Sequence, residues 1–246
     1  MWQSFTERIW GESMKKTTLF SLITLLVLIP ATLYLGTHLR GRWYYLTTTL
    51  VILEAMLPFF VTFESRSPQA RELVMIAVMA ALAVVGRVAI PVPNFKAITG
   101  IIMIAGMAFG PQAGFMTGAI SAFASNFFYA QGPWTPWQMM AYGMGGFLAG
   151  LLFCKRSGRK NRMELVWQTL FAFAAVFFVV GPLLDACTLF TTGGKLTWHY
   201  AGAVMLAGLP HNVIHGASTA ATVLLLSRPL LKKLSRVKVK YGMMEE

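Results

Sequence analysis

The segment SNFFYAQGPWTPWQMM (residues 125–140) decides the fold, because one apolar run ends in it and a second begins. Two prolines, two tryptophans and a glycine separate these runs. Around the segment, the chain of 246 residues is 56% hydrophobic and only 12% charged, with a mean hydropathy of +0.61. A soluble domain exposes far more charge. The composition therefore predicts an all-α, polytopic membrane protein.

Apolar runs of about 18–22 residues recur along the chain, which is enough to cross a hydrocarbon layer of about 30 Å. The first run, from about Thr18 to Thr37, is longer than the apolar part of a signal peptide, about 7–15 residues, so we expect a retained helix. A proline–glycine turn, GPQAG at 110–114, separates two later runs. Eight spans are expected: 18–38, 43–63, 72–90, 97–110, 112–130, 137–154, 165–190 and 200–226.

The formal net charge of +12 comes from basic residues in the short polar connections, so it indicates membrane orientation and not a nucleic-acid partner. With the N-terminus in the cytoplasm, sixteen of the 21 Lys and Arg residues lie on the cytoplasmic side and four on the other. We therefore expect a multi-pass plasma-membrane protein with both termini cytoplasmic. Three connections rich in aromatic, glycine, proline and polar residues then face outward, at 91–96, 131–137 and 191–200.

The outer loop QGPWTPW (131–137) is the strongest candidate for a ligand-binding element. Proline restricts the backbone, so Trp134 and Trp137 would be held on a stiff loop that can stack on a ligand. The alternative is a tryptophan belt at the membrane interface. Asn126 and Gln138 lie within the flanking spans. There each amide needs a hydrogen-bonding partner, which another helix or a ligand would supply.

Two charged side chains near the outer face are further candidates. Arg87 either snorkels to the interface or faces a polar cavity with Asn94 and Lys96. Asp185 is the only aspartate of the chain, and a carboxylate within a membrane is a candidate functional group. We expect it to pair with Arg87, with Lys195 or with a ligand.

The last span contains GLPHNVIHGAST (208–219), in which His211 and His215 are four residues apart and therefore share a helical face. A metal site, buried histidines bonded to neighbouring helices and a polar cavity floor that includes Asn212 are all compatible with this pattern, although no third metal ligand is evident. The chain has no nucleotide-binding loop and no GxSxG or zinc signature, so we expect no ATP hydrolysis.

From about residue 72 to 226 the sequence resembles the substrate-binding S component of energy-coupling factor (ECF) vitamin transporters. The resemblance rests on the small-residue run AVMAALAVVGR (77–87), the segment from PVPNFK to TPWQM (91–139) and the ending GLPHNVIHGAST. The most specific part, SNFF…QGPWTPWQM, looks most like the cobalamin or corrinoid branch. This resemblance implies a six-helix substrate-binding domain at 72–246 and an N-terminal extension with two transmembrane helices at 1–71.

The resemblance further implies a non-enzymatic subunit without cofactor or metal. It would capture a vitamin, by preference cobalamin or a related corrinoid, outside the cell and deliver it with a separate transmembrane coupling subunit and two cytoplasmic ATPases. Ala77 and Ala81 would meet the coupling subunit, since paired small residues allow close helix contact. The implied vitamin site comprises Arg87, Asn94, Lys96, Asn126, Tyr129, Gln131, Trp134, Trp137, Gln138, Asp185, His211 and Asn212.

Two other function classes remain open on the sequence. A stand-alone proton-coupled secondary transporter would use His211, His215, Asp185 and Glu54 as titratable groups. A membrane enzyme would use the histidines or Asp185 as acid or base, but no nucleophile is recognisable.

Overall fold

The computed structural model describes residues 17, 19–37, 43–66, 68–154, 162–191 and 197–242. It divides into two compact units, 1–68 and 69–246. Each unit is described by itself. In the described part of both units all regular structure is helical, which confirms the expected all-α architecture.

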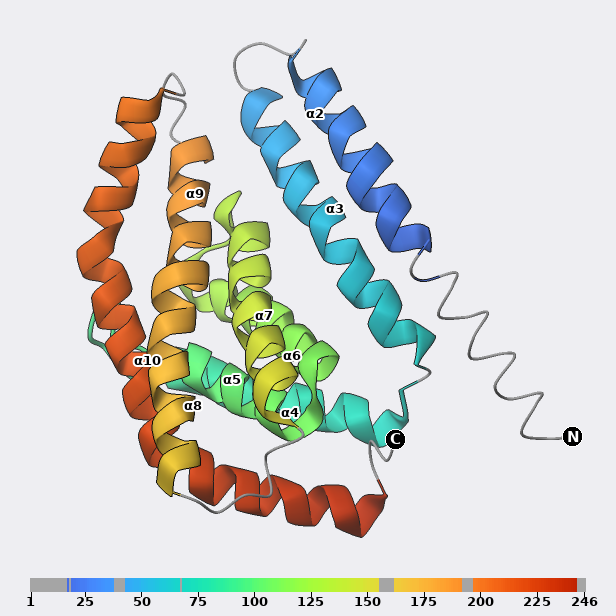
Figure 1. Ribbon diagram of the computed structural model, residues 1–246, viewed down its shortest axis with the longest axis vertical. Coiled ribbons are helices and arrows are strands. Elements are labelled where there is room, and N and C mark those ends of the chain that lie inside the picture. The colour runs from blue at the N-terminus through green and yellow to red at the C-terminus, as the bar shows by residue number, and fades with distance from the viewer. Residues whose placement is uncertain are drawn as a thin grey trace, which may run out of the picture. The chain divides into compact units, whose positions relative to one another are not determined.

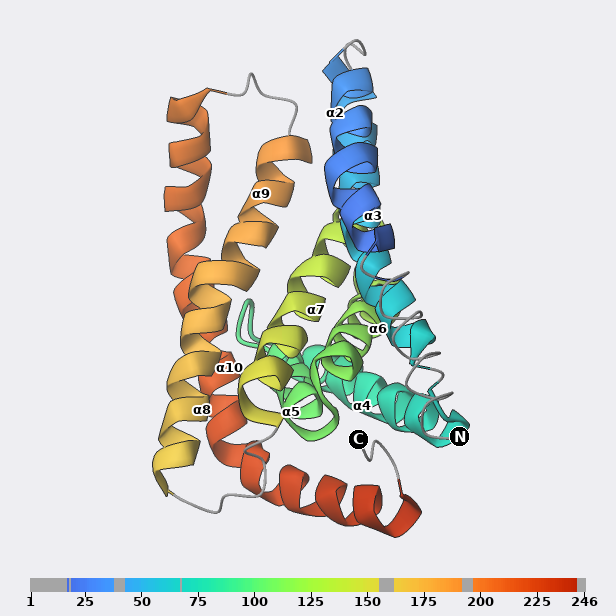
Figure 2. The ribbon, with the colours of Figure 1, turned by 45° about the vertical axis from the view of Figure 1, so that its right-hand side comes forward.

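The first unit is a helical hairpin. A π-helical turn, η1 (Thr24–Leu28), leads into α2 (Ile29–Thr37), and α3 (Trp43–Ser65) follows. Figures 1 and 2 show α2 and α3 side by side. The hydroxyl of Thr32 donates a hydrogen bond of 2.6 Å to the Glu54 carboxylate. The hairpin therefore supplies a polar partner for Glu54, one of the residues that the secondary-transporter hypothesis requires.

The second unit begins with four helices joined by short connections: α4 (Ala70–Val88), α5 (Ile98–Phe109), α6 (Pro111–Tyr129) and α7 (Trp134–Phe153). Its second half consists of α8 (Arg162–Ala175), the π-helical turn η3 (Val176–Val180), α9 (Gly181–Thr191) and α10 (Trp198–Tyr241). Figure 1 shows α8, η3 and α9 as one continuous rod beside α10. This unit contains every residue that the sequence analysis assigned to the vitamin site.

Helix α5 forms the centre of the second unit, and all its residues except Ala108 are buried. Glycines allow α5, α6 and α7 to approach one another closely. A Cβ atom built on Gly106 would lie 2.1 Å from the carbonyl oxygen of Gly146, and one on Gly114 would lie 2.4 Å from the same atom. Side chains larger than hydrogen are excluded at such contacts, so these glycines determine the helix spacing.

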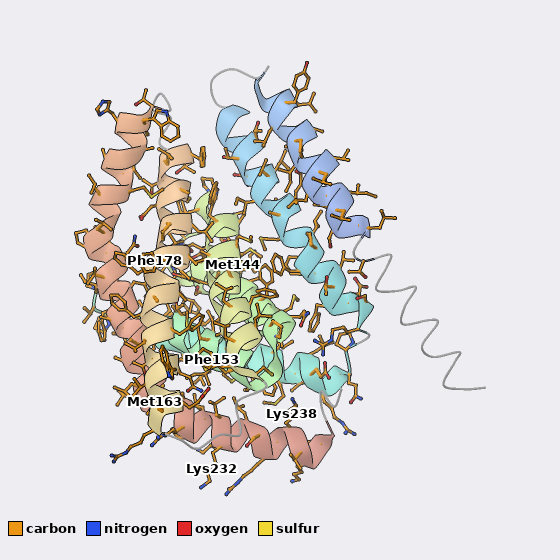
Figure 3. All side chains as sticks on the ribbon, in the orientation of Figure 1. Met144, Phe153, Met163, Phe178, Lys232 and Lys238 are labelled. Carbon is orange, nitrogen blue, oxygen red and sulfur yellow. The ribbon has the colours of Figure 1, made fainter. Side chains whose placement is uncertain are left out.

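The outside of the bundle is apolar, as expected of a surface in contact with lipid. Trp167 and Leu170 on α8 and Phe178 in η3 are more than half exposed (Phe178 is labelled in Figure 3). Two described segments are long and apolar enough to cross a membrane, Leu46–Ser65 and Arg162–Thr191, and Ile98–Phe109 is a shorter apolar helix.

The last helix, α10, continues to Tyr241, well beyond the expected end of the span at residue 226. Figures 1 and 2 show that it changes direction in its C-terminal third and then crosses one end of the bundle. Pro229 lies in this part of the helix. Proline lacks the backbone N–H of the helical ladder and clashes with the preceding turn, so it accounts for the bend.

Candidate functional site

Arg87 lies in the last turn of α4 and connects three helices through its guanidinium group. Its Nη1 donates to the Ser125 hydroxyl at 2.5 Å and to the Asn126 side-chain oxygen at 3.0 Å, both on α6. Its Nη2 lies 3.5 Å from the side-chain oxygen of Gln138 on α7. All three partners are neutral, so they hold the guanidinium in place without cancelling its positive charge. Arg87 therefore faces a polar cluster, as one of the two sequence interpretations proposed.

Two cations share the ring of Tyr129, at the end of α6. The guanidinium carbon of Arg87 is 4.8 Å from the ring centroid and the Lys96 ammonium nitrogen is 5.8 Å from it. The Tyr129 hydroxyl donates to the backbone oxygen of Arg87 at 3.0 Å. Tyr142 on α7 lies on another side, with its ring centroid 5.8 Å from the guanidinium carbon. The aromatic faces favour a positive charge at this position.

The connection between α6 and α7 is fixed by a hydrogen-bond network around Thr135. The Thr135 hydroxyl accepts from the Asn126 amide at 3.0 Å and from the backbone N–H of Gly132 at 3.3 Å, and it donates to the Gln131 side-chain oxygen at 2.8 Å. The Gln131 amide in turn donates to the backbone oxygen of Phe123 at 2.9 Å. Asn126 and Gln131 thus shape the connection, and Asn126 links it to Arg87.

The expectation that Trp134 and Trp137 lie in a loop is wrong, because α7 already begins at Trp134. Pro133 precedes the first helical residue, and Pro136 lies in the first turn, where a missing N–H costs little. The connection is only 130–133, with Ala130 at φ 72°. The Trp134 indole N–H donates to the Ala130 carbonyl at 3.3 Å, and 40% of the side chain is exposed.

Trp137 is positioned differently from Trp134, because only 5% of it is exposed. Its indole is stacked on Phe190 of α9, with centroids 5.6 Å apart and planes inclined by 24°. Among the described residues, no acceptor lies within hydrogen-bonding distance of its Nε1–H. A buried donor without a partner costs about 1–3 kcal/mol. This N–H is therefore an unsatisfied buried donor in the described part of the chain.

A second polar group joins α9 to α10. The Asn212 amide donates to the Asp185 carboxylate at 2.7 Å. Two glycines make room for this pair: a Cβ on Gly208 would lie 2.3 Å from an Asp185 oxygen, and one on Gly181 would lie 2.4 Å from the Asn212 side chain. Asp185 is thus paired with Asn212. The expected pairing of Asp185 with Arg87 is wrong. Lys195, the other expected cation, lies outside the described residues.

His211 and His215 of α10 do not act as a pair. His215 is buried, and its Nε2 lies 2.8 Å from the hydroxyl of Thr99 on α5, while its ring meets the edge of Tyr142 at a centroid distance of 6.0 Å. His211 is exposed, with Nδ1 3.2 Å from the backbone oxygen of Ala207 one turn earlier. Of the three interpretations of this motif, the bonds of His215 correspond to the buried histidine.

The connection between α4 and α5 carries Asn94 and Lys96 and is attached to the bundle at several points. The Ser218 hydroxyl of α10 donates to the backbone oxygen of Lys96 at 3.0 Å. The backbone N–H of Ala97 donates to the Gly86 carbonyl at 3.2 Å. Asn94 is exposed and adopts φ 57°, a left-handed conformation that asparagine tolerates. Lys96 therefore lies beside Arg87 at the Tyr129 ring. Asn94 forms no hydrogen bond to Arg87 or Lys96 in the described part of the chain.

The small-residue pair of α4 lies on the outside. Ala77 and Ala81 are both exposed, while Ile76, Met79 and Ala80 are buried against the rest of the unit. The exposed face is thus available to another helix. Ala77 and Ala81 therefore do not pack within the bundle of the second unit.

The structure therefore collects most predicted site residues into two groups. The Arg87 group comprises Arg87, Lys96, Asn126, Tyr129, Gln131 and Gln138, together with Trp134 and Trp137 at the start of α7. The Asp185 group comprises Asp185 and Asn212. The Arg87 group also contains three residues that the sequence analysis missed: Ser125, Thr135 and Tyr142. Spacing carried a partial signal for Tyr142, which follows Gln138 by four residues and so shares its helical face. His215 connects the two regions, through its contact with Tyr142 and its place one turn after Asn212.

Comparison with known proteins gives one match. A family model described as "ECF-type riboflavin transporter, S component" matches residues 68–235, about two thirds of the chain. The matched range contains both the Arg87 group and the Asp185 group. Searches of curated proteins and of solved structures return no match.

Proposed function

Because the chain belongs to the S-component family of ECF-type riboflavin transporters, we propose that it captures riboflavin at the Arg87 group. S components of this family are membrane-integral, non-enzymatic subunits that bind a small vitamin and work with a coupling subunit and ATPases. The match over 68–235 carries the proposal, and the geometry of the Arg87 group supports it. The corrinoid preference drawn from the sequence is not supported by the match, which is to a riboflavin-type family.

The chemistry of riboflavin suits the side chains of the Arg87 group. Its three-ring isoalloxazine is flat and aromatic, its two carbonyl oxygens accept hydrogen bonds, and its ribityl chain carries hydroxyl groups. Tyr129 and Trp134 keep 43% and 40% of their surface exposed, so both aromatic side chains can contact the isoalloxazine. Arg87 and Lys96 supply N–H donors suited to the carbonyl oxygens. A few polar anchors among aromatic rings are typical of small-molecule sites.

Trp137 supplies the most specific polar anchor of the proposed site. Its buried N–H lacks an acceptor in the described chain, and a flavin carbonyl oxygen or ring nitrogen would satisfy it. Burial makes such a donor selective, because an analogue without an acceptor at that position leaves the N–H unpaired. We assign Trp137 the role of distinguishing flavins from other flat aromatic molecules.

The remaining predicted site residues have supporting roles in this proposal. Asn126 and Gln138 hold Arg87, and Gln131 holds the connection that directly precedes Trp134. A pocket whose side chains are held in advance loses less entropy on binding. Asn94 and His211 are exposed and can meet the vitamin from solvent, and the Asp185–Asn212 pair supplies acceptors and donors for the ribityl hydroxyls.

The orientation and the docking face complete the proposal. Arg71, Arg162 and the basic end of α10 favour a cytoplasmic position for that side of the second unit, which leaves the Arg87 group facing outward. Both termini are then cytoplasmic. The exposed Ala77 and Ala81 on α4 form the face for the coupling subunit, where small side chains permit close helix contact.

Ligand titration of the purified full-length chain tests the substrate. Flavin fluorescence is quenched when the ring stacks on tyrosine or tryptophan, so saturable quenching on addition of the protein is the expected result. Cobalamin is followed in parallel by its visible absorbance. Saturable cobalamin binding together with no riboflavin binding would overturn the flavin assignment in favour of the corrinoid.

Uptake in proteoliposomes tests the transport class. We expect riboflavin accumulation only when the chain is reconstituted with a coupling subunit, ATPases and ATP. Accumulation by the chain alone, abolished when a pH gradient is collapsed, would establish the proton-coupled alternative. Among the described residues, the Asp185 carboxylate bonds to Asn212 and the His215 ring bonds to Thr99, so neither forms a hydrogen bond to another titratable group.

A further inference from the structure

The last third of α10 is a basic helix with no role in the proposed riboflavin site. From residue 228 to 242 the sequence RPLLKKLSRVKVKYG contains no acidic residue. Its basic residues are Arg228, Lys232, Lys233, Arg236, Lys238 and Lys240. Residues 228–240 thus carry six positive charges, and we call residues 228–241 the base helix.

The base helix has two opposite faces. Leu231 and Leu234 are buried, at 9% and 7% exposure, on the side that packs against the bundle. Arg228, Lys232, Arg236 and Lys240 recur every four residues and are all exposed. At 100° per residue, this stripe lies on the arc opposite the two leucines. Figure 3 shows Lys232 pointing away from the bundle. The apolar face is therefore occupied by the protein itself, and the basic face is free for a partner.

The base helix is fastened to the beginning of α4. The Arg71 guanidinium donates to the backbone oxygen of Tyr241 at 2.9 Å and also lies over the Tyr241 ring, 6.0 Å from its centroid. Together with the buried leucines, this contact holds the segment across one end of the bundle, as Figures 1 and 2 show. The basic stripe is therefore a fixed surface and not a loose tail.

The stripe needs an anionic partner. Like charges four residues apart on a helix repel one another and destabilise it. Within the described part of the chain, no carboxylate forms an ion pair with Arg228, Lys232 or Arg236. The charges of Arg228, Lys232 and Arg236 therefore lie on one exposed stripe without a compensating carboxylate in the described part of the chain.

The residues just before the base helix indicate what this partner is. Leu224, Leu225 and Leu226 are exposed at 49%, 71% and 38%, on the part of α10 that runs along the bundle. Because the family is membrane-integral, we expect these exposed leucines to contact lipid acyl chains. Arg228 follows within two residues, so we expect it near the level of the headgroups. A basic cluster directly after a membrane span is the arrangement that attracts acidic lipids, at about 1 kcal/mol per basic residue.

We propose that the base helix is a binding site for the phosphate headgroups of anionic phospholipids in the adjacent leaflet. The exposed leucines contact the acyl chains, and Arg228, Lys232, Arg236 and Lys240 contact the phosphates. Through Arg71 and Tyr241 the bound lipid is connected to α4, the helix with the exposed Ala77 and Ala81. The proposal depends on the membrane location of the family and not on the identity of the vitamin.

Native mass spectrometry of the full-length chain, titrated with phosphatidylglycerol or phosphatidylcholine in detergent, tests this site. The test variant is R228Q/K232Q/R236Q/K240Q, which removes four charges and keeps long polar side chains. The matched control is R228K/K232R/R236K/K240R, which exchanges the same four residues and keeps every charge. Riboflavin titration of each protein verifies that the distant site is intact.

Wild type and control are expected to retain phosphatidylglycerol in preference to phosphatidylcholine, and the preference should fall by about tenfold or more in the glutamine variant. High salt should weaken it, because phosphate contacts at a surface are screened. Equal retention of the two lipids by the wild type would overturn the proposal, as would an unchanged preference in the glutamine variant. If the variant instead loses only its association with a coupling subunit, the basic face is a protein-docking surface and the lipid proposal fails.

Discussion

Replacement of Arg87 by methionine is the most direct test of how the candidate site is held together. Methionine keeps most of the apolar stem and removes the guanidinium. Ser125 and Asn126 are both fully buried and each loses a donor to a side-chain oxygen, at 2.5 and 3.0 Å. Each unsatisfied buried acceptor costs about 1–3 kcal/mol. The Ser125 hydroxyl keeps its own bond to Ala122, which lowers its share. We therefore expect a loss of about 2–4 kcal/mol.

A loss of this size is measurable as a change in melting temperature. For a chain of 150–250 residues, 1 kcal/mol shifts Tm by about 2–4 °C, so Arg87→Met should lower it by about 5–15 °C. The assay is thermal unfolding of the full-length chain in one detergent, followed by intrinsic fluorescence. The matched control is Arg236→Met, because Arg236 is exposed and should shift Tm by less than about 2 °C.

A double-mutant cycle separates the Arg87–Asn126 contact from general disruption. Arg87→Met and Asn126→Ala are measured singly and together, and a direct hydrogen bond predicts a coupling energy of about 1–2 kcal/mol. Additive effects, within about 0.5 kcal/mol, would refute the assigned contact. A shift in Tm of less than 2 °C for Arg87→Met would refute the wider reasoning, because Arg87 would then snorkel to the interface without holding α4 to α6.

Three further predictions test the other parts of the second unit. Trp137→Phe keeps an aromatic ring against Phe190 but removes the unpaired N–H, and it should weaken riboflavin binding about 5- to 30-fold in the fluorescence titration. Trp134→Phe loses only the hydrogen bond from its indole to the Ala130 carbonyl, so it should weaken riboflavin binding less. Gly208→Ala places a methyl group 2.3 Å from the Asp185 carboxylate and should lower Tm by several degrees, whereas Gly202→Ala, with nothing within 4 Å, should not lower it. Ala81→Leu enlarges the exposed face of α4 and should abolish ATP-dependent riboflavin uptake without changing affinity for the vitamin, and an unchanged uptake rate would remove the face from the coupling interface.

The helices of the second unit were largely predictable from sequence, because each apolar run is bounded by proline, glycine or charged residues. The break at Gly110 is an example: it adopts φ 95°, which favours glycine, and α6 begins at the next residue, Pro111. The end of α10 was not predictable in this way. Charged residues after 226 ended the apolar run but not the helix, because Leu231 and Leu234 still pack on the bundle.

The candidate site was predictable by residue type and only partly by contact. Polar side chains in an apolar bundle need partners; this reasoning selected Arg87 and Asn126, and the structure shows a hydrogen bond between them. It could not choose between partners, since Asp185 pairs with Asn212 through room that Gly181 and Gly208 provide on two different helices. Sequence spacing shows which side chains share a face of one helix, whereas the pairing of Asp185 with Asn212 depends on the distance between two helices.

The misplaced tryptophan loop illustrates the same limit and has a functional consequence. Proline was interpreted as a sign of a loop, yet Pro133 and Pro136 lie where a helix tolerates them, before and within its first turn. Trp134 and Trp137 are consequently held by a helix. A helical position directs Trp137 inward against Phe190 and leaves Trp134 partly exposed at the end of the bundle. In the proposed site the Trp134 indole would stack on the vitamin and the Trp137 N–H would donate a buried hydrogen bond, and the helix would hold both side chains in place before the vitamin binds.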